Sequence, residues 1–148
     1  MKDCRKSNSY FKFTNANPKG YTTQGDCAYR AMSVTLGMKW EDVLMEACSI
    51  AVENGWSPAG METEDALLTR HGYTKMKQPR KKDNRLYTGK EFCSYLLKEG
   101  YTENVCVKIG THHLTCFGMV GKKYKILDTW DCSGDAVHTW WVKENHED

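Results

Sequence analysis

The sequence has no apolar run long enough to cross a membrane, and the segment from Met1 to Ser7 lacks the hydrophobic stretch of a signal peptide. It also has no large excess of charge of either sign, because 21 basic and 19 acidic residues leave a formal net charge of +2. Such a balance requires no anionic partner. We therefore expect a cytoplasmic protein that has no contact with a membrane.

The cysteines lack the spacings of disulfide-rich or zinc-binding proteins. No two of them form a C-x-x-C pair, and we interpret them as reduced thiols at positions 4, 27, 48, 93, 106, 116 and 132. A metal cluster is the competing interpretation for His112, His113, Cys116 and Cys132. Because these four residues lack the spacing of a tetrahedral site, we predict neither a metal nor another cofactor.

The pattern of apolar residues predicts a helical first part that is followed by a sheet. Recurrence at three- and four-residue intervals predicts helices over 27–36, 41–54, 64–71 and 90–99. Segments rich in β-branched and aromatic residues then predict an antiparallel meander within 104–142. There is no alternating βαβ pattern and no glycine-rich phosphate loop. We expect one α+β domain over residues 1–148, with the helices packed on the sheet, a cleft between them, and residues 1–10 as a loose end.

Basic residues gather between the third and fourth predicted helices. Pro79 interrupts any regular element there, and Asp83 is the one acidic residue among Lys75, Lys77, Arg80, Lys81, Lys82 and Arg85. Tyr87 is the only aromatic residue nearby, whereas nucleic-acid sites usually interleave basic and aromatic groups. We interpret 75–85 as a solvated loop and expect no nucleic-acid binding, with an acidic protein partner as the alternative.

Cys27 is the candidate nucleophile, because the helical pattern of 27–36 begins at this residue. A thiol in the first turn of a helix faces unpaired backbone N–H groups and the positive end of the helix dipole, which favour the thiolate. Asp26 is the natural N-cap, and we expect its carboxylate to cap the first turn and to pair with Arg30. Alternatively, Cys27 is a small apolar residue that fills a helix start.

Counting along one predicted hairpin brings a histidine and a carboxylate together. If Gly121 and Lys122 form a two-residue turn, Thr115 lies opposite Asp128, and His113 lies on the same face as both. His112 then points to the other face of the sheet. Diagonal neighbours on one face of a hairpin lie within side-chain reach, so His113 and Asp128 are expected to interact. The outer imidazole nitrogen is then free for a thiol, as cysteine catalysis requires.

These residues carry a resemblance to the papain-like cysteine peptidases. Cys27 at a helix start, His113 at the start of a strand, and Asp128 two residues before Trp130 follow the order of that family, in which an Asn stands at the third position. The segment 25–31 also resembles the D-G-x-C-x-x-R-A segment of ovarian-tumour-type deubiquitinases. The closest similarity, over roughly residues 11–142, is to small bacteriophage and gut-bacterial proteins with D-C-x-x-R-A and D-T-W-D motifs, which here read Asp26 to Ala31 and Asp128 to Asp131.

The resemblance implies a papain-like fold and a Cys-His-Asp triad that acts on a protein or peptide substrate by way of a thioester, in the bacterial host's cytoplasm if the chain is phage-encoded. Trp130 is expected to screen the His113–Asp128 hydrogen bond from water, to pack in the core, or both. One departure concerns the oxyanion hole, because the family's Gln six residues before the cysteine is Tyr21 here. Gln24 is the nearest substitute, together with the backbone N–H of Cys27.

Two other functions are compatible with the sequence. The unfilled oxyanion position also fits a non-catalytic papain-like interaction protein, such as a phage factor that binds a host target. The same three residue types also serve Cys-dependent acyltransferases, which pass the acyl group to an amine.

Overall fold

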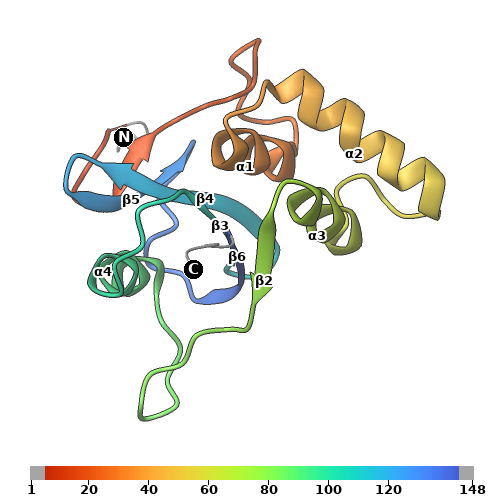
Figure 1. Ribbon diagram of the computed structural model, residues 1–148. Helices are drawn as coiled ribbons and strands as arrows, with labels where there is room; N and C mark the ends of the chain where they lie inside the picture. Colours follow the sequence, from red (N-terminus) through yellow and green to blue (C-terminus); the bar gives the residue numbers. More distant parts are fainter. Residues whose placement is uncertain (1–5, 144–148) are drawn as a thin grey trace.

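A six-stranded sheet with strand order β1-β5-β4-β3-β6-β2 forms the centre of the computed structural model, which describes residues 6–143. The strands are β1 (Phe11–Phe13), β2 (Tyr73–Met76), β3 (Val105–Ile109), β4 (His113–Val120), β5 (Lys123–Asp128) and β6 (Val137–Lys143). The helices are α1 (Cys27–Leu36), α2 (Trp40–Asn54), α3 (Met61–Arg70) and α4 (Gly89–Lys98). The fold is therefore α+β, with each of the four helices within a few residues of its predicted bounds (Figure 1).

Helices cover both faces of this sheet. α1, α2 and α3 lie on one side, and α4 lies on the other (Figure 1). Successive side chains of β3 point to opposite faces of the sheet. Val105 and Val107 pack into a core with Phe92 of α4, whereas Cys106 packs into a second core with Met32 of α1. Both faces of the central strands carry buried apolar side chains, so each face needs a cover. The prediction that all four helices form one lobe is therefore wrong for α4.

The strand connections differ from the predicted meander in three places. β3, β4 and β5 do follow one another as antiparallel neighbours, but β6 pairs with β3 and not with β5. β1 adds to β5 in parallel, so the sheet is not purely antiparallel. β2 pairs with β6, which places Lys75 and Met76 in an edge strand where the sequence predicts a loop. Tyr73, at the start of β2, is buried in the core that α1 to α3 cover.

The hairpin between β4 and β5 has the predicted register. Gly121 adopts a positive φ of 67°, as a tight turn requires, and Val120 pairs with Lys123. The pairing continues to Cys116 and Leu127, so that the next residues along, Thr115 and Asp128, lie opposite each other. The predicted placement of Thr115 opposite Asp128 is therefore confirmed.

The start of the described chain is attached to the sheet. The Asn8 side chain donates to Asp131 at 2.9 Å, and the Ile126 N–H donates to the carbonyl of Tyr10 at 2.8 Å. The ring of Tyr10 packs against the core that α4 covers. The prediction of a loose end over 1–10 is therefore wrong for residues 8–10, and its first five residues lie outside the described part of the chain.

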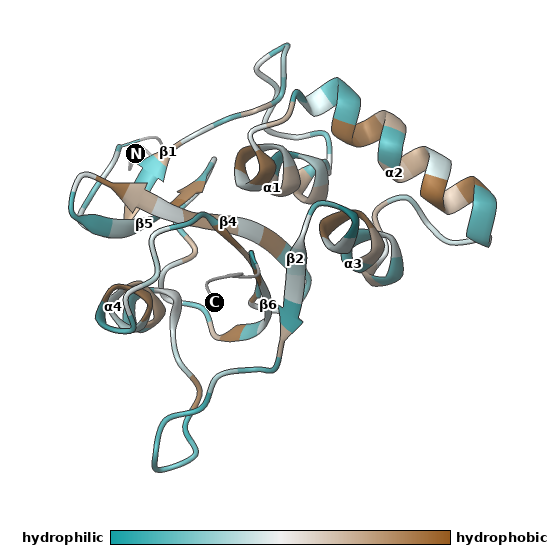
Figure 2. Cartoon of the chain, in the orientation of Figure 1, coloured by the Kyte–Doolittle hydropathy of each residue, from teal (hydrophilic) through white to brown (hydrophobic). Residues whose placement is uncertain are grey.

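The basic segment after β2 is mostly exposed, as predicted. Figure 2 shows it as a hydrophilic loop that projects from the sheet, and Arg85 pairs there with Asp83. Lys81 pairs with Glu91 of α4, which ties the loop to that helix. None of the helices between residues 6 and 143 combines the length and the apolar character that a membrane span needs.

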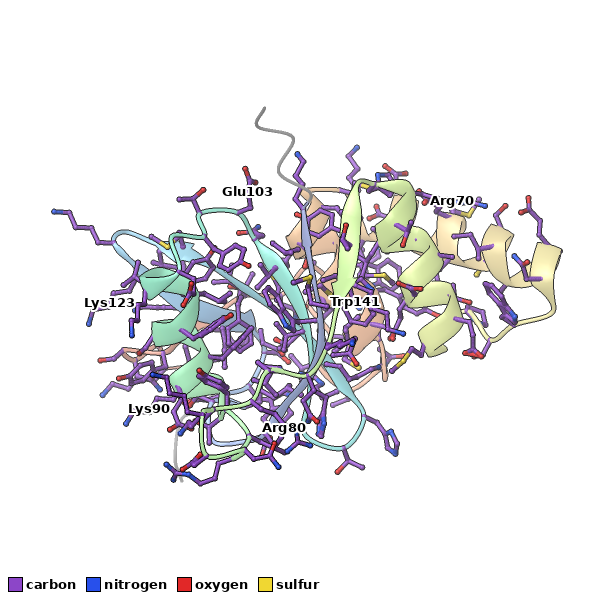
Figure 3. The ribbon with its side chains drawn as sticks, turned by 60° about the horizontal axis from the view of Figure 1, so that its bottom comes forward. Arg70, Arg80, Lys90, Glu103, Lys123 and Trp141 are labelled. Carbon is purple, nitrogen blue, oxygen red and sulfur yellow. The ribbon has the colours of Figure 1, made fainter. Side chains whose placement is uncertain are left out.

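Trp141 of β6 lies between the sheet and α3, whereas the side chains of Arg70 and Lys123 lie at the periphery (Figure 3). Trp141 is fully buried, and its indole N–H donates to Asp65 of α3 at 2.8 Å. A buried indole usually finds such a partner. This hydrogen bond joins α3 to β6 of the sheet.

Replacing Thr88 by alanine should lower the free energy of unfolding by about 1 kcal/mol, because a capping box begins α4. The Thr88 hydroxyl accepts from the N–H of Glu91, and the Glu91 carboxylate accepts from the N–H of Thr88. Urea unfolding of both proteins measures the difference. Thr102→Ala, at an exposed loop position, is the matched control and should change stability little. Equal losses in the two variants would contradict the capping role.

Candidate active site

Cys27 is the first residue of α1, and its half-buried thiol contacts the start of β4. A hydrogen bond with the His113 side chain lowers the pKa of this thiol and outweighs the opposing effect of burial. A hydrogen bond from the Leu114 backbone and the nearby charges of His113 and Arg30 lower it further. The site therefore favours the thiolate of Cys27, which is the nucleophilic form.

His113 lies between Cys27 and Asp128. Its Nε2 is 2.6 Å from Oδ2 of Asp128, so Nδ1 is the ring nitrogen left for the thiol. Burial of the ring disfavours the charged form, but the hydrogen bonds to Asp128 and Cys27 outweigh it and raise the pKa of His113 to about 9. The predicted contact between His113 and Asp128 is thus present, and the two opposite shifts of the pKa values favour an imidazolium beside a thiolate.

The carboxylate of Asp128 is buried at the end of β5 and is held from several sides. The Thr115 hydroxyl donates to Oδ2 at 2.6 Å, and the Thr129 N–H donates to Oδ1 at 2.6 Å. The predicted register puts Thr115 on the same face of the sheet as Asp128, but nothing in the sequence indicates that it holds the carboxylate. These bonds fix the orientation of the carboxylate and therefore of the His113 ring.

Arg30 links the site to a second buried carboxylate. Its guanidinium forms a close ion pair with Asp26 and lies 3.9 Å from Oδ1 of Asp128. It is also within 3.5 Å of the Thr129 hydroxyl, while its Nε is buried with no hydrogen-bond partner within residues 6–143. The i, i+4 spacing from Asp26 indicated the first pair, but no sequence signal indicated that the same cation reaches Asp128.

Asp26 stands at the N-cap position of α1, but its carboxylate makes no capping hydrogen bond, so this part of the prediction is wrong. Oδ2 instead accepts from the side chains of Asn17 at 2.9 Å and Trp40 at 3.0 Å. The physical reason is the ion pair with Arg30, which turns the buried carboxylate away from the N–H groups of the first turn. Asp26 therefore joins α1 to α2 and to the preceding loop.

Trp130 and His112 complete the comparison with the predicted site. The Trp130 ring lies over the His113 ring at a centroid distance of 4.8 Å and is 40% exposed. Its predicted packing in the core is therefore wrong, and it covers the imidazole from the solvent side. His112 is exposed and lies in the turn before β4, so its predicted position on the other face of the strand stays a prediction.

Gln24 is exposed and lines a cavity of about 360 Å³ beside the start of α1. Every residue that lines this cavity belongs to the segment before α1, to α1 itself or to α2. The sequence predicts a cleft between the helices and the sheet, whereas this cavity contains no residue of the sheet. The role of Gln24 as an oxyanion donor stays a prediction.

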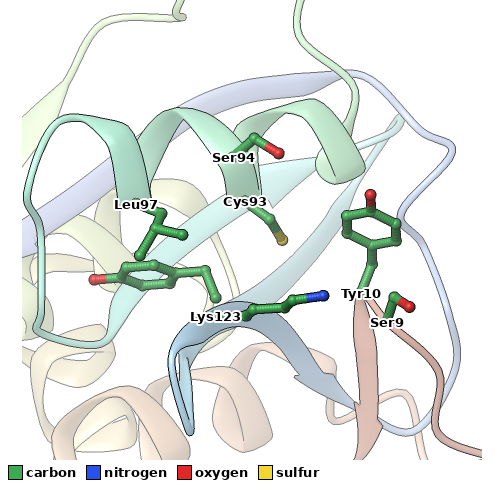
Figure 4. Close-up of a pocket in the computed structure, with 7 residues that line it drawn as sticks. Ser9, Tyr10, Cys93, Ser94, Leu97 and Lys123 are labelled. Atoms are coloured by element: carbon green, nitrogen blue, oxygen red, sulfur yellow. The ribbon is translucent and has the colours of Figure 1, made fainter.

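Cys93 provides a contrast to Cys27 on the opposite side of the sheet. It lines a smaller cavity of about 180 Å³ between α4 and the β4–β5 hairpin, with Tyr10 and Lys123 nearby (Figure 4). Burial raises the pKa of Cys93 to about 12. Because this thiol stays protonated at neutral pH and has no imidazole neighbour in that cavity, it lacks the properties of a nucleophile.

One group of possible metal ligands coincides with the site. The ligand atoms of His113, Asp128 and Cys132 lie within 4.8 Å of one another. However, the first two already share a hydrogen bond of 2.6 Å, and burial raises the pKa of the Cys132 thiol, which opposes the thiolate that a metal needs. The arrangement therefore suits proton transfer between Cys27 and His113 better than metal binding.

At pH 6, iodoacetamide should alkylate Cys27 faster than the other described cysteines, because the pKa of the Cys27 thiol is lowered. The imidazolium of His113 should lose its proton as the pH rises through about 9, which an NMR titration of the ring measures. Peptide mapping across pH values measures the first effect, and Cys93 serves as the slow internal control. Preferential labelling of any other cysteine at pH 6 would contradict the assignment.

Comparisons of the chain with protein-family models, with curated proteins and with solved structures find no match. The geometry of the site is therefore the basis on which a function is inferred. A thiol, an imidazole and a carboxylate in hydrogen-bonding sequence form the constellation of nucleophilic catalysis at a carbonyl carbon.

Proposed function

We propose that this protein is a cysteine peptidase or isopeptidase that acts through Cys27, His113 and Asp128. The observation that carries the proposal is the position of His113 between the thiol of Cys27 and the buried carboxylate of Asp128, which lies 2.6 Å from Nε2 of the ring. The position of Cys27 at the N-terminus of α1 supports it, because the helix dipole favours the thiolate.

In the acylation step, the thiolate of Cys27 attacks the carbonyl carbon of the scissile amide, and a C–S bond forms. The tetrahedral intermediate then collapses, the C–N bond breaks, and His113 gives its proton to the departing amine. Asp128 holds the ring in the orientation that this transfer requires. The products of the step are a thioester on Cys27 and a free amine.

In the deacylation step, neutral His113 takes a proton from water, and the oxygen attacks the thioester carbon. The C–S bond then breaks and a carboxylic acid leaves. Cys27 is again a thiolate, and the proton from water stays on His113 as the imidazolium. Water is the default acceptor for a thioester, so hydrolysis is favoured over transfer to an amine.

The oxyanion of both intermediates needs hydrogen-bond donors. The backbone N–H of Cys27 is one candidate, because the first N–H groups of a helix have no intrahelical acceptor. Gln24 is the second, three residues earlier and exposed to solvent. Loss of one such donor typically slows catalysis by about 10²–10³-fold.

A papain-like fold is part of the proposal, as is membership of the family with D-C-x-x-R-A and D-T-W-D motifs. Its support is the order of Cys27, His113 and Asp128 along the chain and the packing of α1 on β4. Two features differ from the predicted helical lobe on an antiparallel sheet. β1 pairs with β5 in parallel, and α4 lies on the opposite side of the sheet from the other three helices.

The proposal is tested with a peptide library whose cleavage products are identified by mass spectrometry, with Cys27→Ala as the inactive control. New carboxyl termini that depend on Cys27 support a peptidase. Strict dependence of product release on an added primary amine would instead indicate an acyltransferase. Failure of any substrate or acyl probe to acylate Cys27 would favour the non-catalytic interaction protein.

A further inference from the structure

The small cavity between α4 and the β4–β5 hairpin lies on the other side of the sheet from α1 and has no part in the chemistry described above (Figures 1 and 4). We infer that this cavity is a docking site for an acidic segment of a partner protein, which inserts one aromatic or large aliphatic side chain between Tyr10 and Leu97. The docking site is independent of the proposed function, because none of the residues that line it belongs to the triad.

The walls of the cavity are mainly apolar. Leu97 of α4 lines it and is 44% exposed, whereas its neighbour Leu96 is fully buried in the core. The buried ring of Tyr124 forms a second wall, and its hydroxyl is already used in a hydrogen bond of 2.5 Å to the carbonyl of Glu103. The ring of Tyr10 stands opposite Leu97 (Figure 4). A volume of about 180 Å³ accommodates one large side chain and is smaller than the roughly 300–1,000 Å³ of sites for whole small molecules.

The rim of the cavity is basic. Lys123 lines it, Lys122 precedes Lys123 in the hairpin turn, and the ammonium of Lys90 lies 5.1 Å from the centre of the Tyr10 ring. All three lysines are exposed, and none of them forms an ion pair with another residue within 6–143. Unpaired cations around an apolar hollow attract carboxylates and steer an acidic partner toward it.

The carboxylates of the neighbouring elements do not neutralise these lysines. Glu91 is the one acidic residue of α4, and it pairs with Lys81. Asp128 is the one acidic residue of the hairpin, and it is buried in the active site. Glu99 follows α4 by one residue and lies about 200° around the helix axis from Leu97, so it points away from the cavity. The surface around the cavity therefore favours an acidic segment over a basic one.

The wall that Tyr10 forms is fixed to the sheet. The N–H of Tyr10 donates to the Asn8 side chain at 2.8 Å, and the carbonyl of Tyr10 accepts from the N–H of Ile126 at 2.8 Å. Lys125 donates to the carbonyl of Asn8 at 2.7 Å, which attaches the same segment to β5. The cavity is thus formed without a guest, and this lowers the entropic cost of docking.

The test measures fluorescence polarisation of labelled peptides with the full chain that carries Cys27→Ala, so that no peptide is cleaved. The first peptide has glutamates and serines around one central phenylalanine, the second has glycine in place of the phenylalanine, and the third has lysines in place of the glutamates. The phenylalanine peptide should bind at least about tenfold more tightly than the glycine peptide. Added salt should weaken its binding, and the lysine peptide should not bind.

Two variants separate the apolar from the charged part of the site. Leu97→Ser should weaken only the phenylalanine peptide, whereas Lys123→Glu should weaken both acidic peptides. Lys75→Glu is the control, because it changes the net charge equally at an exposed position of β2, at the other edge of the sheet. Circular dichroism shows whether each variant is folded, and Lys123→Glu decides if Leu97→Ser is not.

Four results would overturn the inference. They are the absence of saturable binding, equal affinities of the phenylalanine and glycine peptides, binding of the lysine peptide, and equal losses in Lys123→Glu and Lys75→Glu. Sedimentation of the protein alone provides a further check. Self-association that Leu97→Ser abolishes would show that a second copy of the chain occupies the cavity, and this would also overturn the inference.

Discussion

Replacement of His113 by alanine should slow the alkylation of Cys27 at pH 6 by at least about tenfold. The lowered pKa of the thiol depends first on its hydrogen bond with His113, which the variant lacks. An ordinary thiol with a pKa near 8.5 is less than about 1% thiolate at pH 6. Stopped-flow or quenched iodoacetamide kinetics, combined with peptide mapping of Cys27, measure the loss.

The neighbouring histidine provides the matched control for this experiment. His112 is exposed in the turn before β4, so His112→Ala should keep most of the reactivity of Cys27. A loss of similar size in both variants would indicate a general disturbance of the β4 start. Reactivity that persists in His113→Ala would remove the basis for the triad.

Replacement of Arg30 by methionine should lower the free energy of unfolding by about 3–5 kcal/mol. The guanidinium is the cation that pairs with the buried carboxylate of Asp26 and lies 3.9 Å from that of Asp128. Removal of one partner from a buried ion pair leaves an uncompensated charge, which costs far more than the net value of the pair. Denaturant unfolding monitored by tryptophan fluorescence gives the difference in stability.

Two further variants separate charge from shape at this position. Arg30→Lys keeps the cation but loses the planar fork, so it should recover only part of the stability. Asp26→Asn combined with Arg30→Met removes one of the two carboxylate charges and should be more stable than Arg30→Met alone. A single variant Arg30→Met as stable as the natural chain would show that the guanidinium contributes little to this network.

The sequence by itself determined the parts of the site that depend on local periodicity. The switch from loop to helical pattern located the start of α1 at Cys27, and a two-residue turn at Gly121 and Lys122 determined by counting that His113 meets Asp128. Such features are readable because a helix repeats every 3.6 residues and a strand every two, so that a short stretch defines which side chains share a face.

Only the tertiary structure decided which distant segments meet. The pairing of β6 with β3 and of β2 with β6, and the position of α4 on the far face of the sheet, join segments whose own patterns are compatible with other arrangements. The same holds for Arg30, whose ion pair with Asp26 is local but whose contact with Asp128 spans most of the chain. Burial chose among the alternatives, because two apolar faces must both be covered and buried charges must find partners wherever they lie.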